Sequence, residues 1–118
     1  HGTLWIKVIR AENLLGKDRG GTSDPYARIS IDGRQLVTHV VKATTEPVWD
    51  ETVTAPFNRG VRLMQLELFD SDPLADDFLG RVFVPLSHVG TNPVTSWHTV
   101  GKRGPKSHVR GRVQISMW

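Results

Sequence analysis

The sequence has 118 residues with 15 basic and 12 acidic side chains, no cysteine and 38% hydrophobic residues. This length fits one domain with a single core. The absence of cysteine excludes a disulfide scaffold, a thiolate zinc site and a cysteine nucleophile. No apolar run approaches the roughly 20 residues needed to span a bilayer. The chain begins at His1 without a signal-peptide pattern, so we expect residues 1–118 to be one domain cut from a longer protein.

Short runs rich in Val, Ile, Leu, Thr and Trp alternate with turn residues, which is the pattern of strands. In the first run, Leu4, Ile6 and Val8 alternate with other residues, as in a strand with one buried face. The expected strands are, in chain order, 3–11, 25–31, 35–42, 49–57, 62–69, 81–86, 96–100 and 109–117. Eight short strands predict an all-β fold, an eight-stranded antiparallel β-sandwich.

The net charge of +3 conceals an uneven distribution. All 12 acidic residues lie within 1–77, whereas 78–118 contain 6 basic residues and no acidic one. Six of the eight aspartates fall in two short windows, namely Asp18 with Asp24, and Asp70 with Asp72, Asp76 and Asp77. Clustered like charges cost free energy in a folded protein unless something neutralises them.

The strand order predicts that the two aspartate windows meet. If each strand crosses the sandwich once, successive connections alternate between its two ends. The connections 12–24, 43–48 and 70–80 therefore share one end, and both windows lie on them. The expected counter-ion there is Ca²⁺, which takes 6–8 oxygen ligands from carboxylates, backbone carbonyls and water.

Other cations fit this pattern less well. Mg²⁺ demands near-ideal octahedral geometry and keeps its waters. Zinc is disfavoured because the five histidines are scattered and form no short ligand pair. A local EF-hand beginning at Asp70 fails, because the required glycine position is Ala75 and the twelfth position is Arg81.

Three segments, 18–26, 47–51 and 69–80, resemble those of a C2 domain, the calcium-dependent phospholipid-binding module. The resemblance covers essentially the whole chain. The sequence is similar in organisation to the C2 domains of extended synaptotagmins and tricalbins. It implies a Greek-key sandwich of type II topology, with the last strand beside the first.

The resemblance also implies a set of functional residues. In the family, five loop aspartates chelate two or three Ca²⁺ ions, and these match Asp18, Asp24, Asp70, Asp72 and Asp77, with Asp76 as the alternative to Asp77. Backbone carbonyls of Arg19 and Ser71 are the expected supplementary ligands. The expected membrane contacts are Pro73, Leu74 and Arg19.

The function implied is calcium-dependent binding of anionic phospholipid membranes of the phosphatidylserine type. We expect a cytoplasmic monomer that is recruited to the cytosolic face of membranes and binds no nucleic acid, with any protein partner reached through the parent protein. The alternative is a calcium-independent protein–protein interaction module on the same fold. An enzyme is not expected, because no motif positions a nucleophile beside a base.

One family feature is weak in this sequence. The strand that often carries a lysine-rich phosphoinositide patch, residues 35–42, has a single lysine, Lys42. A basic run near the C-terminus offers a substitute, and its residues are Lys102, Arg103, Lys106, Arg110 and Arg112. Sequence alone leaves open whether this run is a solvated linker or a lipid site.

Overall fold

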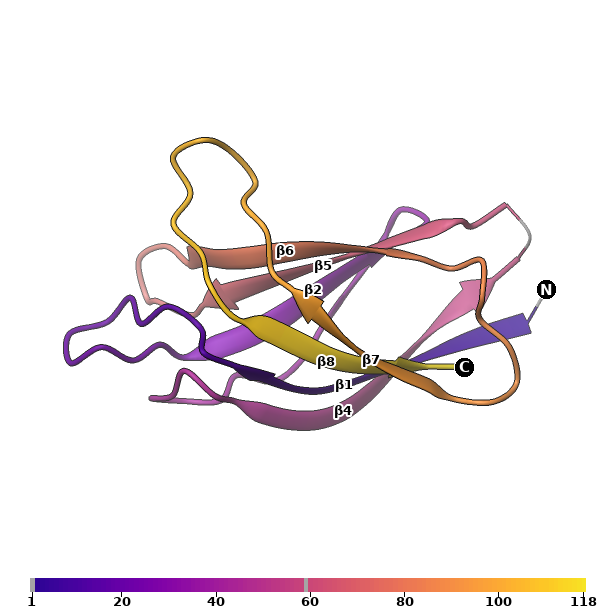
Figure 1. Ribbon diagram of the computed structural model, residues 1–118, viewed down its shortest axis with the longest axis horizontal. Helices are drawn as coiled ribbons and strands as arrows, with labels where there is room; N and C mark the ends of the chain where they lie inside the picture. The colour runs from indigo at the N-terminus through magenta and orange to yellow at the C-terminus, as the bar shows by residue number, and fades with distance from the viewer. Residues whose placement is uncertain (1, 59) are drawn as a thin grey trace.

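The computed structural model describes residues 2–58 and 60–118 and forms two stacked four-stranded antiparallel sheets (Figure 1). The strands are β1 (Gly2–Glu12), β2 (Pro25–Ile31), β3 (Arg34–Val37), β4 (Val48–Phe57), β5 (Leu63–Asp70), β6 (Asp77–Pro85), β7 (Val94–Thr99) and β8 (Arg112–Met117). One sheet has the order β4-β1-β8-β7 and the other β3-β2-β5-β6. The expected eight-stranded sandwich is confirmed, and so is the last strand beside the first.

The connections follow a Greek-key path. After β1 the chain crosses to the second sheet for β2 and β3, and then returns to place β4 beside β1. Within the described residues every regular element is a strand, and no helix is long and apolar enough to cross a membrane.

The core lies between the two sheets and follows the alternation read from the sequence. Leu4, Ile6 and Val8 of β1 are fully buried. Val113 and Ile115 of β8 pack into the same cluster from the neighbouring strand. Burial of alternate side chains fixes the register of each strand, because a slip of one residue would expose its whole apolar face.

The third strand is shorter than expected, because it ends at Val37 rather than at position 42. The side chain of Thr38 interrupts the ladder. Its hydroxyl accepts a hydrogen bond from the backbone N–H of Ala27 at 2.9 Å, and so replaces a backbone carbonyl. The chain then runs towards β4 without regular pairing, although Val41 still donates to the carbonyl of Pro25.

Strand β6 begins four residues before the expected start at Arg81. A register shift between Leu68 and Phe69 of β5 lets the pairing continue to the strand end, where Asp70 faces Asp77. Gly80 makes this possible, since its φ of 152° lies in a region that favours glycine. The fifth connection is therefore only six residues long, from 71 to 76.

Gly80 is predicted to be sensitive to substitution. A Cβ at this position would lie 2.5 Å from Cβ of Val100, which is itself buried. Gly80→Ala is expected to lower the free energy of unfolding by about 1–3 kcal/mol through overpacking. Urea denaturation measures this loss. Gly90→Ala is the control, because a Cβ at Gly90 meets nothing within 4 Å; equal stability of the two variants would contradict the prediction.

Candidate metal centre

The connections that carry the aspartates gather at one end of the sandwich. Residues 13–24, 38–47 and 71–76 lie together at the end opposite the two chain termini (Figure 1). Backbone hydrogen bonds join them, because Ser71 donates to the carbonyl of Asp24 and Thr44 donates to that of Ser23. The prediction that the two aspartate windows meet is therefore confirmed.

Three carboxylates converge at the centre of this end. Asp18 and Asp24 come from the first connection, and Asp70 is the last residue of β5. One carboxylate oxygen from each lies within 4.8 Å of the others. This spacing matches donors that share one cation, since Ca²⁺–oxygen distances are about 2.3–2.6 Å.

Asp24 joins the three connections through its own hydrogen bonds. Its backbone N–H donates to Oδ1 of Asp70 at 2.7 Å, and its own Oδ1 accepts the N–H of Ala43 at 2.7 Å. Ala43 has a φ of 57°, in the left-handed region, and this local backbone strain accompanies its contact with Asp24. The carboxylates are therefore held by hydrogen bonds rather than left on independent loops.

The first connection is held in shape by two residues that sequence reasoning did not assign to the site. The buried Ser23 hydroxyl donates to the carbonyl of Leu15 and accepts the N–H of Lys17, each at 3.0 Å. Gly16 lies against the chain at Gly21, where a Cβ would come within 2.0 Å of a carbonyl oxygen. The signal for this in the sequence is that small residues, Gly16 and Ser23, lie on both sides of Asp18, where the chain can pack closely against itself.

Asp70 has the most unusual environment of the cluster. Its side chain is fully buried, and among the described residues its Oδ2 has no hydrogen-bond partner. Burial raises the pKa of Asp70 to about 6, and the charges of Asp18 and Asp24 add to the rise against the lowering effect of the Asp24 N–H. A buried carboxylate with an unpaired oxygen, lying beside two other carboxylates, costs free energy unless a cation neutralises it.

The remaining aspartates of the second window lie outside this triad. Asp76 accepts hydrogen bonds from the Tyr26 hydroxyl and from the N–H of Asp72, and Asp72 accepts the N–H of Leu74. The hydrogen bond from Tyr26 lowers the pKa of Asp76, and burial of the phenol with the same hydrogen bond raises the pKa of Tyr26 to about 12. Asp76 thus braces the loop, while Asp77 is exposed and faces Lys17 across a pocket.

The expected membrane contacts lie at the surface of the same end. Leu74 is 96% exposed and is flanked by exposed Pro73 and Ala75. Arg19 is exposed at the turn closed by the hydrogen bond from Gly21 to the carbonyl of Asp18. An apolar tip and a basic tip therefore stand beside the acidic cluster.

The donor set fits calcium better than other metals. The three clustered groups are all carboxylates, and no histidine or cysteine belongs to the cluster found among the described residues. Hard oxygen donors on loops suit Ca²⁺, whose coordination is flexible. The buried oxygen of Asp70 that lacks a hydrogen-bond partner among the described residues could serve as a further donor to such a cation.

Comparison with known proteins gives the family. A sequence model of the C2 domain matches residues 2–100. The chain is 35% identical over 105 residues to multiple C2 and transmembrane domain-containing protein 2 of Mus musculus, covering 88% of this chain and 12% of that protein. It is 42% identical over 94 residues to extended synaptotagmin-1 of Rattus norvegicus, covering 73% of this chain and 8% of that protein. The chain thus spans about a tenth of the length of these relatives.

Solved structures agree with the sequence comparison. A calcium-bound pair of C2 domains from extended synaptotagmin 2 superposes with a TM-score of 0.83 at 31% identity, over 98% of this chain and 44% of that one. A single C2 domain of a plant extended synaptotagmin 1 has a TM-score of 0.87 at 20% identity, covering 98% of this chain and 92% of that one, and supports the fold alone. The chain belongs to the C2 domain family.

Proposed function

We propose that this C2 domain binds anionic phospholipid membranes when calcium occupies the acidic end of the sandwich. The observation that carries the proposal is the convergence of Asp18, Asp24 and Asp70, with a buried oxygen of Asp70 that lacks a partner. The likeness to a calcium-bound C2 structure supports the choice of ion.

The proposed ligands extend beyond the triad. Asp70 supplies its free Oδ2, and Asp18 and Asp24 supply carboxylates from the first connection. Asp72 and Asp77 complete the carboxylate set from the 71–76 connection and the start of β6, with the backbone carbonyls of Arg19 and Ser71 as further donors. Bound Ca²⁺ supplies positive charge and open coordination positions that lipid phosphates can fill.

The charge distribution supports an electrostatic switch. Apart from the six loop aspartates, the chain has 15 basic residues against 6 acidic ones, so its body is strongly basic. The acidic end repels an anionic membrane surface, and this repulsion disappears when calcium neutralises the aspartates. On this proposal the domain acts as a monomer in the cytoplasm and is recruited to the cytosolic face of a membrane.

Vesicle co-sedimentation tests the proposal. The wild-type domain is expected to sediment with phosphatidylserine-containing vesicles in Ca²⁺ but not in chelator, and to ignore phosphatidylcholine vesicles under both conditions. Asp70→Asn/Asp72→Asn should abolish the calcium-dependent fraction. Asp32→Asn/Asp50→Asn removes the same number of charges from residues outside the acidic cluster and should retain binding. Equal sedimentation of the wild type in Ca²⁺ and in chelator would refute the switch.

A further inference from the structure

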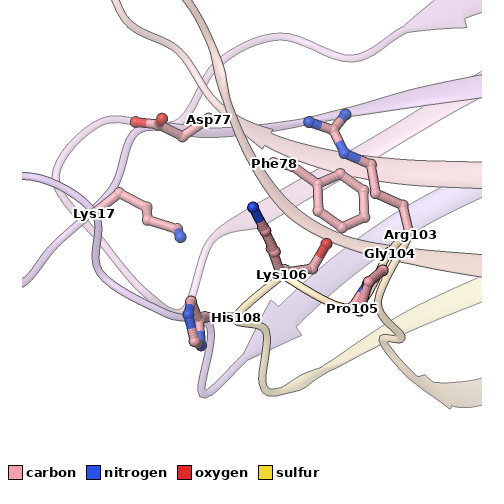
Figure 2. A pocket seen from close by; sticks show the side chains of 9 residues that line it. Lys17, Asp77, Phe78, Arg103, Gly104, Pro105, Lys106 and His108 are labelled. Carbon is pink, nitrogen blue, oxygen red and sulfur yellow. The ribbon is translucent and has the colours of Figure 1, made fainter.

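A basic pocket opens beside the acidic cluster. Its volume is about 610 Å³, and it lies between the first connection, the start of β6 and the connection from β7 to β8 (Figure 2). The side chains that define its charge are Lys17, Asp77, Arg103 and Lys106, and the rest of the lining is Phe78, Gly104, Pro105, Ser107 and His108. Three cationic side chains against one carboxylate favour an anionic ligand.

The pocket has a fixed wall. The connection from β7 to β8 is closed at its base by a 3.0 Å hydrogen bond from Val100 to the carbonyl of Gly111. Gly101 then pairs with Arg81 of β6 through two backbone hydrogen bonds, of 2.8 and 2.9 Å. Beyond this, a turn closed by Ser107 donating to the carbonyl of Gly104 positions the basic residues. A loop held at these points loses less entropy when it binds a ligand.

Arg103 is held by an aromatic row. Its guanidinium carbon lies 4.5 Å from the ring centroid of Phe78. Phe78 meets Phe69 of β5 edge-on at 6.0 Å, and Phe69 stacks with Tyr26 of β2 at 5.8 Å. A stacked guanidinium still presents the N–H groups at its edge, in the geometry that binds phosphate oxygens in pairs. Figure 2 shows the ammonium groups of Lys17 and Lys106 pointing into the space between the loops.

The basic run near the C-terminus is thus divided by the fold. Arg103 and Lys106 line the pocket, whereas Lys102 and Arg110 are exposed outside its lining. Arg112 lies on β8, where it pairs with Glu12 at 2.6 Å and stacks on a tryptophan ring. The binding residues are therefore a defined subset of the run.

We infer that this pocket binds a phosphate group, and that Asp77 couples its occupancy to calcium. Arg103, Lys106 and Lys17 would neutralise the phosphate, while the Asp77 carboxylate opposes it until calcium neutralises that charge. The coupling rests on the proposed calcium site, but the pocket itself does not. By linkage, a bound phosphate also raises the affinity for calcium. The phosphate belongs either to a lipid headgroup or to a soluble molecule. The cationic side chains of the pocket would bind both in the same way, so the experiment has an arm for each.

The first experiment is done in chelator, so that the pocket is tested without calcium. Inorganic phosphate is titrated into the labelled domain while amide chemical shifts are followed by NMR, with phosphatidic acid in phosphatidylcholine vesicles as the lipid arm. Saturable shifts confined to the residues that line the pocket, namely 17, 77–78 and 103–108, are expected. Arg103→Gln/Lys106→Gln should weaken binding about tenfold or more, because charge-assisted hydrogen bonds are lost.

The matched control is Lys102→Gln/Arg110→Gln, which removes two charges from the same connection outside the pocket. It should change the affinity by no more than about twofold, since only long-range attraction is lost. Equal losses in the two double variants, or no saturable shift at 103–108, would overturn the pocket. Binding of inorganic phosphate without a preference for phosphatidic acid vesicles would support the pocket and assign its ligand to a soluble phosphate.

The coupling is tested separately. Asp77→Asn should raise the affinity for inorganic phosphate in chelator several-fold, while Asp70→Asn/Asp72→Asn should leave residues 103–108 responsive to phosphate. If the wild-type domain shows no response to calcium while its phosphate shifts are intact, the proposed function and the coupling are refuted, but the pocket is not. No effect of Asp77→Asn would overturn the coupling alone.

Discussion

Asp70→Asn is expected to raise the melting temperature of the domain in chelator and to abolish its stabilisation by calcium. In the wild type, folding buries a carboxylate with a free oxygen beside two other acidic groups. Asparagine keeps the acceptor for the Asp24 N–H and places an amide N–H₂ where the free oxygen was. A ligand that binds only the folded state stabilises the protein, so calcium should stabilise the wild type. The variant is expected not to bind calcium and therefore should not be stabilised by it.

The magnitude follows from the pKa of Asp70. A rise from 3.8 to about 6 corresponds to about 2–3 kcal/mol of destabilisation when the group is ionised at neutral pH. For a domain of this size the melting temperature should increase by about 5–10 °C. Differential scanning calorimetry in chelator and in Ca²⁺ measures both effects. Asp32→Asn, in the exposed turn between β2 and β3, is the control and should change neither.

The pH dependence gives an independent readout. Because the folded pKa of Asp70 lies above its unfolded value of 3.8, the folded chain binds more protons between these pH values. The stability of the wild type relative to Asp70→Asn is therefore greatest below about pH 4 and is lost as pH rises through about 6. A difference between the two proteins that is flat across this range would contradict the assignment, as would a variant that calcium still stabilises.

The meeting of the two aspartate windows at one end of the sandwich could be predicted from the sequence for a simple physical reason. Alternation such as Leu4, Ile6 and Val8 marks strands with one buried face, and the number of strands then decides which connections share an end. Asp24 and Asp70 consequently meet although 46 residues separate them. Neither step requires the course of any loop to be known.

Where side chains point within loops was not predictable in this way. Asp76 and Asp77 are neighbours in sequence, yet one braces its loop through Tyr26 and the other faces the basic pocket. The basic run also reads as one cluster, but Arg112 belongs to a strand and pairs with Glu12. The direction of these side chains depends on loop backbone angles and on pairing between distant segments. Neither can be inferred from the order of charged residues along the chain.

The exposed leucine at the loop tip predicts a second large effect. Leu74 is 96% exposed, so its apolar side chain gains no free energy of burial in the folded domain. If the tip enters the membrane interface, burying this side chain contributes about 1.5–3 kcal/mol. Because about 1.4 kcal/mol corresponds to a tenfold change in affinity, Leu74→Ala should weaken calcium-dependent vesicle binding about tenfold.

Calcium affinity measured without vesicles separates this role from an effect on the metal site. Leu74→Ala should leave that affinity unchanged, since the hydrogen bond from Leu74 to the proposed ligand Asp72 comes from the backbone N–H, which alanine keeps. Leu63→Ala is the matched control, because Leu63 is half-exposed at the opposite end of β5 from Asp70. If both leucine variants bind vesicles as the wild type does, the loop tip stays outside the membrane and electrostatic attraction alone holds the domain at its surface.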